Sequence, residues 1–222
     1  MPASPEEKGF GQGDPALARW AEKVFQPEDE VLREIRERSV REGLPAIAVG
    51  KFDGLHLEVI ARAIGAARCV EIGTLGGYSG VCLLRAMGEK GVLHTFELSE
   101  KHAQVARESF RKAGFAKRAH LHVGPALQML REIEGEAPFD LVFVDADKGS
   151  YPAYLAWAAK HLRERGVILA DNAFGFGEIH RADASPEIKA LAKFNEELAR
   201  GGRFRTTMIP TAEGLAMGVK IR

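Results

Sequence analysis

The chain of 222 residues has only two cysteines, Cys69 and Cys82, and this scarcity excludes several kinds of site. Two cysteines cannot form a zinc motif or a disulfide framework. Cys69 lies in a predicted strand and Cys82 in a predicted helix, so we expect both thiols to be buried and reduced. The seven histidines include no His-Glu-x-x-His pattern. His94, His120 and His122 fall in strand-like runs, and we interpret them as structural or surface groups.

The chain also lacks an excess of charge and any long apolar run. Basic and acidic residues number 31 each, so the net charge is zero, whereas a general nucleic-acid binder carries a basic excess. No apolar run approaches the roughly 20 residues that cross a bilayer, and no apolar core of a signal peptide is visible. We therefore expect a cytoplasmic protein that binds neither nucleic acid nor a membrane.

Two common nucleotide-binding motifs are missing from the most glycine-rich turn, "VEIGTLGGYSG" at residues 70–80. The dinucleotide motif Gly-x-Gly-x-x-Gly would need a glycine at Leu75, and a phosphate-binding loop would need Gly-Lys-Ser/Thr at its end. Glu71 before the turn would repel a pyrophosphate and better suits a cationic ligand. The alternative is an ordinary turn between a strand and a helix that binds nothing.

Short apolar runs alternate with helical patterns along most of the chain. The runs are "ARCVEI", "VLHTFEL", "AHLHVG", "FDLVFVDA" and "GVILAD", and the helical patterns lie near 78–88, 99–113, 125–133 and 150–163. Such alternation predicts parallel strands covered by helices on both faces, which is a doubly wound α/β fold. After a predicted helix at 186–200, "RFRTTMIP" and "GLAMGVKI" are joined by a short link and should pair antiparallel.

The N-terminal region breaks this rhythm. Residues 1 to about 15 are rich in Pro, Gly and Glu and are interpreted as a mobile arm. Residues 29–42 predict an amphipathic helix, and Asp53 is a plausible N-cap for another that runs to about Ile64. We therefore expect an N-terminal arm over residues 1–26, partly mobile, and a single domain over residues 27–222.

Ligands of such folds bind beyond the carboxyl ends of the strands, so residues that follow each strand are candidates. Glu97 ends the second strand, 24 residues after Gly73, where an acidic group can accept hydrogen bonds from both hydroxyls of a ribose. The alternative is that Glu97 only caps the next helix, which Ser99 can do unaided. Gly124 forms a turn after the third strand.

The fourth and fifth strands end in a larger group of polar residues. Asp145, Asp147 and Lys148 follow one strand, and Asp171 and Asn172 follow the next. Since neighbouring strands lie about 5 Å apart, Asp145, Asp171 and Asn172 could converge on one point. Two carboxylates and an amide oxygen suit Mg²⁺, Ca²⁺ or Mn²⁺ better than zinc. The alternative is that each residue caps a helix or lines a solvated cleft.

Taken together, these motifs resemble the class I methyltransferases that depend on S-adenosylmethionine (SAM). More narrowly, the chain resembles the cation-dependent O-methyltransferases of catechols and caffeoyl-coenzyme A, from about residue 27 to the end. The resemblance rests on "VEIGTLGGYSG", "FVDADKGSYPAYL", "LADN" and "PTAEGLAMGVK", in that order and spacing. It implies a Rossmann-like sheet, a SAM cofactor, a divalent metal such as Mg²⁺, a small aromatic hydroxyl acceptor and a homodimer.

The resemblance also implies roles for single residues. The residues expected around the methionine part of SAM are Val49, Glu71, Gly73, Thr74, Gly77, Tyr78 and Ser79. Glu97 would hold the ribose, Gly124 and Ala126 would lie near the adenine, and Asp147 would lie by the cofactor. Asp145, Asp171 and Asn172 would bind the metal, with Asp145 also near the cofactor. Lys148 matches the lysine that is proposed as the general base in the catechol enzyme.

The sequence departs from the family pattern in three places. Glu213 stands where the closing hairpin usually has Asp, and "AFGFGEIHRADA" after Asn172 replaces an aliphatic residue followed by Trp. Ala146 replaces the bulkier residue of the mammalian catechol enzyme. Other acceptors, such as a coenzyme A thioester or an antibiotic precursor, therefore stay open. Two rivals from other classes are a nicotinamide-dependent oxidoreductase and a SAM-binding protein without catalysis.

Overall fold

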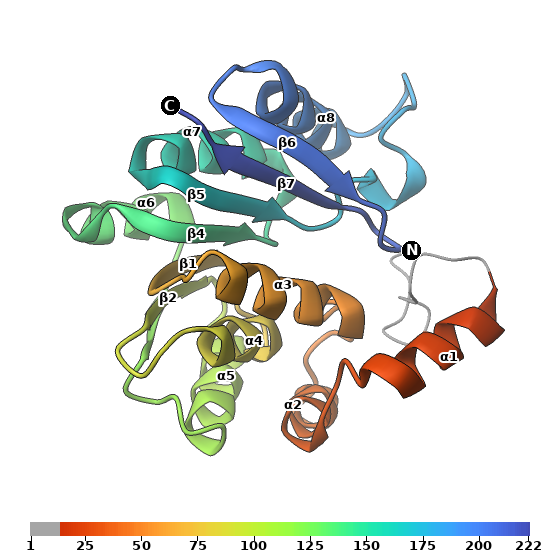
Figure 1. Cartoon of the computed structure of the whole chain (residues 1–222), viewed down its shortest axis with the longest axis vertical. Helices are drawn as coiled ribbons and strands as arrows, with labels where there is room; N and C mark the ends of the chain where they lie inside the picture. The colour runs from red at the N-terminus through yellow and green to blue at the C-terminus, as the bar shows by residue number, and fades with distance from the viewer. Residues whose placement is uncertain (1–13) are drawn as a thin grey trace.

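A single mixed β-sheet organises residues 14–222, the part of the chain that this computed structural model describes (Figure 1). Its strands run in the order β3-β2-β1-β4-β5-β7-β6. Their bounds are β1 Arg68–Ile72, β2 Val92–Glu97, β3 Ala119–Val123, β4 Phe139–Val144, β5 Leu162–Ala170, β6 Phe204–Ile209 and β7 Leu215–Lys220. The predicted doubly wound α/β fold is confirmed.

The direction of the strands also follows the prediction. β1 to β5 pair in parallel, and β7 pairs antiparallel with both β5 and β6. The chain moves outward from β1 through β2 to β3 and then returns to β4 on the other side of β1. The strand order therefore reverses between β1 and β4, which is where doubly wound sheets form a crevice for ligands.

Helices cover both faces of the sheet. The long helices are α2 Glu30–Arg41, α3 Lys51–Ala63, α4 Tyr78–Ala86, α5 Glu100–Lys112, α7 Tyr151–His161 and α8 Pro186–Arg200. The short ones are α6 Ala126–Met129 and the 3₁₀ turns η1 Leu130–Glu136, η2 Lys148–Ser150 and η3 Gly175–Gly177. Buried side chains of α2 to α5 form one core, and those of η1, α7 and α8 form the other.

Strand β1 shows how the alternation of side chains builds these two cores. Val70 and Ile72 pack into the α7–α8 core, whereas Cys69 packs into the α2–α5 core. Each fully buried aliphatic side chain contributes roughly 1.5–3 kcal/mol to folding. Cys69 and Cys82 are free and buried, as expected, and burial raises the pKa of both thiols.

Helix starts follow the sequence in one case and not in another. Asp29 caps α2, because its carboxylate accepts the main-chain N–H of Leu32 at 3.0 Å. The prediction of Asp53 as an N-cap is wrong: α3 begins at Lys51 after Gly50, and Asp53 lies buried in the first turn. Because Gly50 has the extended backbone that precedes a helix, the chain turns there without a side-chain cap.

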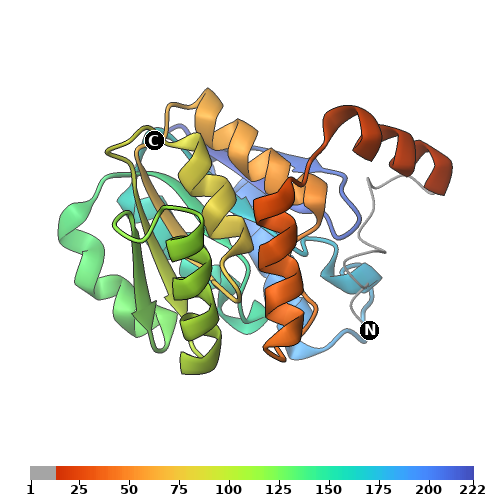
Figure 2. The same ribbon diagram turned by 90° about the horizontal axis from the view of Figure 1, so that it is seen from below.

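Helix α1, Pro15–Phe25, was not predicted. Asp14 caps it by accepting the N–H of Ala16, and Pro15 occupies its first position, where proline fits best. The helix lies to the side of the sheet (Figure 2) and exposes Trp20, Val24 and Phe25. Residues 1–13 of the predicted arm lie outside the described part of the chain. None of the helices in residues 14–222 is long and apolar enough to cross a membrane.

Candidate active site

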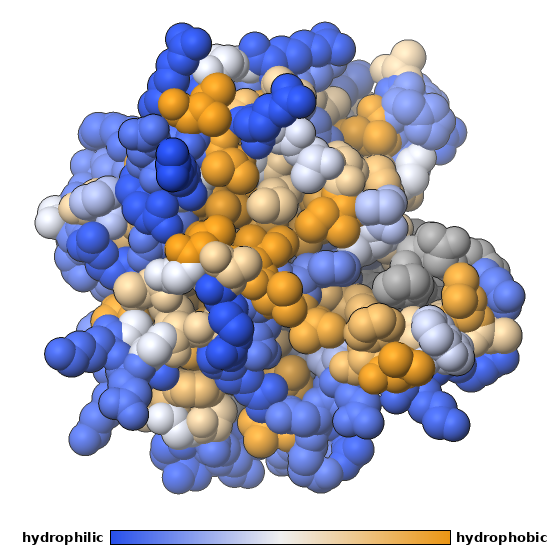
Figure 3. All heavy atoms as spheres, in the orientation of Figure 1, coloured by the Kyte–Doolittle hydropathy of each residue, from blue (hydrophilic) through white to orange (hydrophobic). Residues whose placement is uncertain are grey.

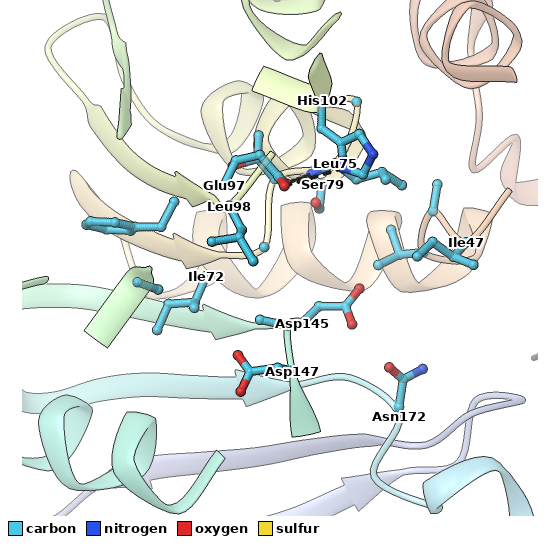
Figure 4. A pocket seen from close by; sticks show the side chains of 18 of the residues that line it. Ile47, Ile72, Leu75, Ser79, Glu97, Leu98, His102, Asp145, Asp147 and Asn172 are labelled. Carbon is cyan, nitrogen blue, oxygen red and sulfur yellow. Dashed lines mark hydrogen bonds and ion pairs between the residues drawn. The ribbon is translucent and has the colours of Figure 1, made fainter. Parts of the chain in front are cut away.

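A cavity of about 580 Å³ opens at the carboxyl ends of β1, β2, β4 and β5 (Figure 4). It lies at the reversal of the strand order, where the fold predicts a ligand. Glu97 and His102 lie on one side of it, and Asp145, Asp147 and Asn172 on the other.

The glycine turn forms the wall nearest β1. Gly73 has φ +100°, and a Cβ there would lie 1.9 Å from the main-chain oxygen of Asp145. Only glycine therefore allows the ends of β1 and β4 to approach so closely. This contact brings the turn and the acidic end of β4 into one cavity.

Glu97 is fixed against the glycine turn by main-chain donors. Its Oε2 accepts the N–H of Leu75 at 2.8 Å, and its Oε1 accepts the N–H of Ser99 at 2.9 Å. His102 Nδ1 lies 3.4 Å from the same Oε1. Ser99 caps α5 by accepting the N–H of His102, so Glu97 is not needed for that purpose. A held carboxylate at the cavity wall suits the predicted ribose contact.

Lys148 stands in a network at the end of β4. Its Nζ donates to Asp145 Oδ1 at 3.0 Å and to the Tyr151 hydroxyl at 2.8 Å. The Tyr151 hydroxyl in turn lies 3.2 Å from the main-chain oxygen of Asp171. Burial raises the pKa of Tyr151 well above its usual value, and Asp145 and Asp171 add to this effect. Tyr151 thus stays a neutral hydroxyl that fixes Lys148.

Asp147 has a separate partner on α7. Its Oδ1 accepts the hydroxyl of Tyr154 at 2.7 Å. Burial, together with Asp147, raises the pKa of Tyr154, so this hydroxyl also stays protonated. Both residues line the cavity.

The predicted metal ligands come from two neighbouring strand ends. Asp171 is buried, and Asn172 lines the cavity with its amide nitrogen donating to Glu213 Oε2 at 2.8 Å. A carboxylate can only accept, so the amide oxygen is left to face the other way. Within residues 14–222, no group of three His, Cys, Asp or Glu side chains is placed to hold a metal. The set of two carboxylates and one amide fits a hard cation by its oxygen chemistry.

Glu71 lies behind the wall instead of in it. It is completely buried on the α2–α5 face of β1, where its Oε2 accepts the Thr95 hydroxyl at 2.6 Å. The Thr95 hydroxyl is 2.5 Å from that of Thr74, which lines the cavity. Burial raises the pKa of Glu71 to about 7, and Asp145 and Glu97 act in the same direction.

Most predicted site residues meet in this one cavity. The lining includes Val49, Gly73, Thr74, Tyr78, Ser79, Glu97, Gly124, Ala126, Asp145, Asp147, Lys148 and Asn172. Glu71, Gly77 and Asp171 do not line it. Gly77 has φ +88° and is the N-cap residue before α4, so its contribution is to the backbone of the turn.

The family model for O-methyltransferases matches residues 22–221. The chain belongs to the O-methyltransferase family.

Several relatives and solved structures of similar sequence are named O-methyltransferases. A catechol O-methyltransferase of Mycobacterium tuberculosis is 45% identical over 148 residues, which is 66% of this chain and 67% of that protein. An O-methyltransferase of Bacillus cereus, solved with S-adenosylhomocysteine, has TM-score 0.87 and 35% identity over 92% of this chain and 97% of its own. TomG of Streptomyces achromogenes, solved with SAM, has TM-score 0.87 and 32% identity over 93% and 96%. This chain is therefore a SAM-dependent O-methyltransferase.

Membership in the O-methyltransferase family removes the two rivals from other classes, the nicotinamide-dependent oxidoreductase and the SAM-binding protein without catalysis. Several residues that line the cavity were not among the site residues expected from the sequence. These are Arg36 and Ser39 of α2, Tyr154 of α7, and Phe176 of η3. Arg36 and Ser39 lie outside the strand-end motifs, and tertiary packing brings them to the cavity. Tyr154 lies within "FVDADKGSYPAYL" and Phe176 within the segment after Asn172, but neither was singled out as a site residue.

Proposed function

We propose that this O-methyltransferase methylates one hydroxyl of an aromatic vicinal diol, with a divalent cation, Mg²⁺, bound beside the acceptor. The observation that carries the proposal is the meeting of Lys148, Asp145 and Asn172 in one cavity with the glycine turn and Glu97. The relative of Mycobacterium tuberculosis that is named a catechol O-methyltransferase supports the choice of acceptor.

The residues that would hold the cation are Asp145, Asp171 and Asn172. When bound, the cation would orient the diol and favour its ionised form, by the logic that lowers the pKa of metal-bound water. Two carboxylates at neighbouring strand ends repel each other without a positive charge between them. Lys148 Nζ lies 3.0 Å from Asp145 Oδ1, on the side of Asp145 that faces Tyr151.

Lys148 is proposed as the general base. A phenol with a pKa near 10 is mostly protonated at about neutral pH, so its proton must be removed for attack on the methyl group. The hydroxyl of Tyr151 holds the Nζ of Lys148 from one side and Asp145 holds it from the other. In its neutral amine form, Lys148 Nζ would accept the hydroxyl proton as the oxygen–methyl bond forms and the methyl–sulfur bond breaks.

The remaining residues position SAM. Glu97 would accept the ribose hydroxyls, Gly124 and Ala126 would border the adenine, and Thr74, Tyr78, Ser79 and Val49 would surround the methionine part. With donor and acceptor held in line, positioning supplies much of the acceleration. Glu71 is proposed to support this wall through Thr95 and Thr74.

The proposal is tested by methyl transfer from labelled SAM to a panel of catechols, each with and without a metal chelator. Activity that disappears with chelator and returns with Mg²⁺ supports acceptor class and metal together. Methyl transfer to catechols that is unchanged by the chelator rejects the proposed role of the metal. Tight binding of S-adenosylhomocysteine without transfer to any catechol rejects the acceptor class.

A second acceptor class is favoured by one feature, the aromatic and glycine-rich segment after Asn172. Phe176 lines the cavity and is 46% exposed, so it offers an apolar surface to a larger acceptor. TomG is described as involved in tomaymycin synthesis, which is a precedent for a secondary metabolite. A coenzyme A thioester and a phenolic secondary metabolite therefore belong in the same panel.

We further propose that the enzyme is a cytoplasmic homodimer that uses α1 in its interface. α1 exposes Leu17, Trp20, Val24 and Phe25, and hydrophobic side chains lie along it in Figure 3. Two free, buried thiols suit a reducing compartment. Sedimentation should give a dimer for the wild type and a monomer for Trp20→Glu. A monomeric wild type would reject the dimer.

A further inference from the structure

The turn before β7 is joined to the segment that follows β5. β5 and β7 pair antiparallel up to Ala170 and Ala216. Two more main-chain bonds extend the contact beyond the sheet: Ala173 N–H donates to the oxygen of Gly214 at 2.9 Å, and Phe174 N–H donates to that of Glu213 at 3.0 Å. Glu213 is therefore held next to Asn172, although 41 residues separate them.

The side chains of these two residues form a directional contact. Asn172 Nδ2 donates to Glu213 Oε2 at 2.8 Å, and the residues are 5% and 7% exposed. A carboxylate accepts hydrogen bonds and has none to donate, so it can bind only the nitrogen end of an amide. A flipped amide would set two acceptor oxygens against each other in a buried place.

This hydrogen bond also fixes the direction of the Asn172 amide oxygen. With its nitrogen on Glu213, Asn172 turns its oxygen toward the side of the cavity where Asp145 lies (Figure 4). A metal ligand needs this orientation, because an amide coordinates a hard cation through oxygen. Asn172 also has φ +59°, an uncommon backbone for a residue other than glycine, so its whole placement depends on its surroundings.

We infer that Glu213 is a positioning residue that orients the Asn172 amide for cation binding. The inference rests on the proposed metal at Asp145, Asp171 and Asn172, and Glu213 is not one of the ligands. Outer partners of this kind commonly change metal affinity 10–100-fold.

Two other roles for Glu213 predict different results. A carboxylate that acts only by its charge would lose its effect in Glu213→Gln as fully as in Glu213→Leu. An orienting acceptor would not, since the glutamine oxygen can still accept the N–H of Asn172. The pair of variants therefore separates orientation from charge. If Glu213 were a direct ligand, Glu213→Leu would still weaken cation binding when Asn172 is replaced by alanine.

The experiment is calorimetric titration of Mn²⁺ into the full-length enzyme loaded with S-adenosylhomocysteine. Glu213→Leu should weaken Mn²⁺ binding at least about 10-fold, and Glu213→Gln less than about 3-fold. In an Asn172→Ala background, Glu213→Leu should cause no further loss, because the group that it orients is gone. Glu196→Gln, on an exposed glutamate of α8, is the matched control and should bind like wild type.

Equal losses in Glu213→Gln and Glu213→Leu, or equal effects of Glu213→Leu with and without Asn172, would overturn the inference. Affinity for S-adenosylhomocysteine reports whether each variant is folded, and it should stay within about 2-fold. Asp171→Ala in the same titration tests the proposed metal site separately from the role of Glu213. Wild-type Mn²⁺ binding that does not depend on Asp171 rejects the proposed metal site, and with it the inference. Mn²⁺ binding that depends on Asp171 but is unchanged in the Glu213 variants rejects the role of Glu213 and leaves the proposed metal site in place.

Discussion

The proposed cofactor half of the cavity and its proposed acceptor half are built from different parts of the chain. In the cofactor half, Gly73, Leu75 and Glu97 lie within 25 residues, and main-chain N–H groups fix the carboxylate. In the acceptor half, Lys148, Asn172 and Glu213 come from three distant segments and are fixed by side-chain contacts. The first half should thus tolerate distant changes, whereas the second depends on the packing of β5, β7 and α7.

The largest effect is expected from Asp171→Ala, which removes a proposed ligand in the acceptor half. Loss of several kcal/mol of cation stabilisation corresponds to a fall of roughly 10³-fold in kcat/KM. Affinity for SAM, measured by calorimetry, should change less than about 2-fold. Asp183→Ala, on an exposed aspartate, should retain full activity. Full, chelator-insensitive activity of Asp171→Ala would show that the metal role is wrong.

Lys148→Met should lower kcat roughly 10²- to 10³-fold by removing the base while leaving SAM bound. Lys148→Arg is the sharper variant, because arginine keeps the charge beside Asp145 but does not give up its proton. Both variants should be similarly slow in single-turnover methyl transfer. Recovery of the rate in Lys148→Arg would mean that Lys148 supplies only charge.

Glu97→Ala should act on the cofactor half. Two hydrogen bonds that the ribose hydroxyls donate to the Glu97 carboxylate are worth a few kcal/mol, so SAM affinity should fall roughly 10- to 100-fold. The KM of the acceptor should stay nearly constant. Glu100→Ala, on the exposed surface of α5, is the control. Unchanged SAM affinity by calorimetry would refute the ribose assignment.

The smallest effect on catalysis is expected from Glu71→Gln, whose main consequence is on stability. Its pKa is about 7 in the folded chain, against about 4.3 when unfolded, so the folded state binds the proton more tightly. This contribution is complete below about pH 4 and is lost as the pH rises to about 7.

From pH 5 to pH 8, the free energy of unfolding of the wild type should fall by roughly 3 kcal/mol relative to Glu71→Gln. Denaturant unfolding at both pH values measures this difference, and Glu196→Gln, on an exposed glutamate, provides the control. Parallel stability profiles for wild type and Glu71→Gln would contradict the raised pKa.

The sequence predicted residues in both halves, where they follow directly from the ends of strands. Gly73, Glu97, Asp145 and Asn172 follow directly from strand ends, because parallel strands bring their carboxyl ends to one edge. Glu71 was placed around the cofactor, but the period of two in β1 turns its side chain away from the cavity.

Contacts between segments that are distant in the chain could not be predicted from the sequence. The pairing of Asn172 with Glu213 depends on the register of β5 against β7, and no local pattern encodes it. Arg36 reaches the cavity only because α2 packs against α4, and its Nη2 donates to the oxygen of Val49 at 3.2 Å. Helix α1 was missed because its Pro- and Gly-rich approach was interpreted as part of an arm.

The most direct test of the central claim is optical titration of 4-nitrocatechol into the enzyme loaded with S-adenosylhomocysteine, with Mg²⁺ or with chelator. The proposed site predicts tight binding with Mg²⁺ and the spectral shift of an ionised catechol, both lost with chelator and in Asp171→Ala. Equal binding and an equal spectrum with chelator would contradict a metal that holds and ionises the acceptor beside SAM.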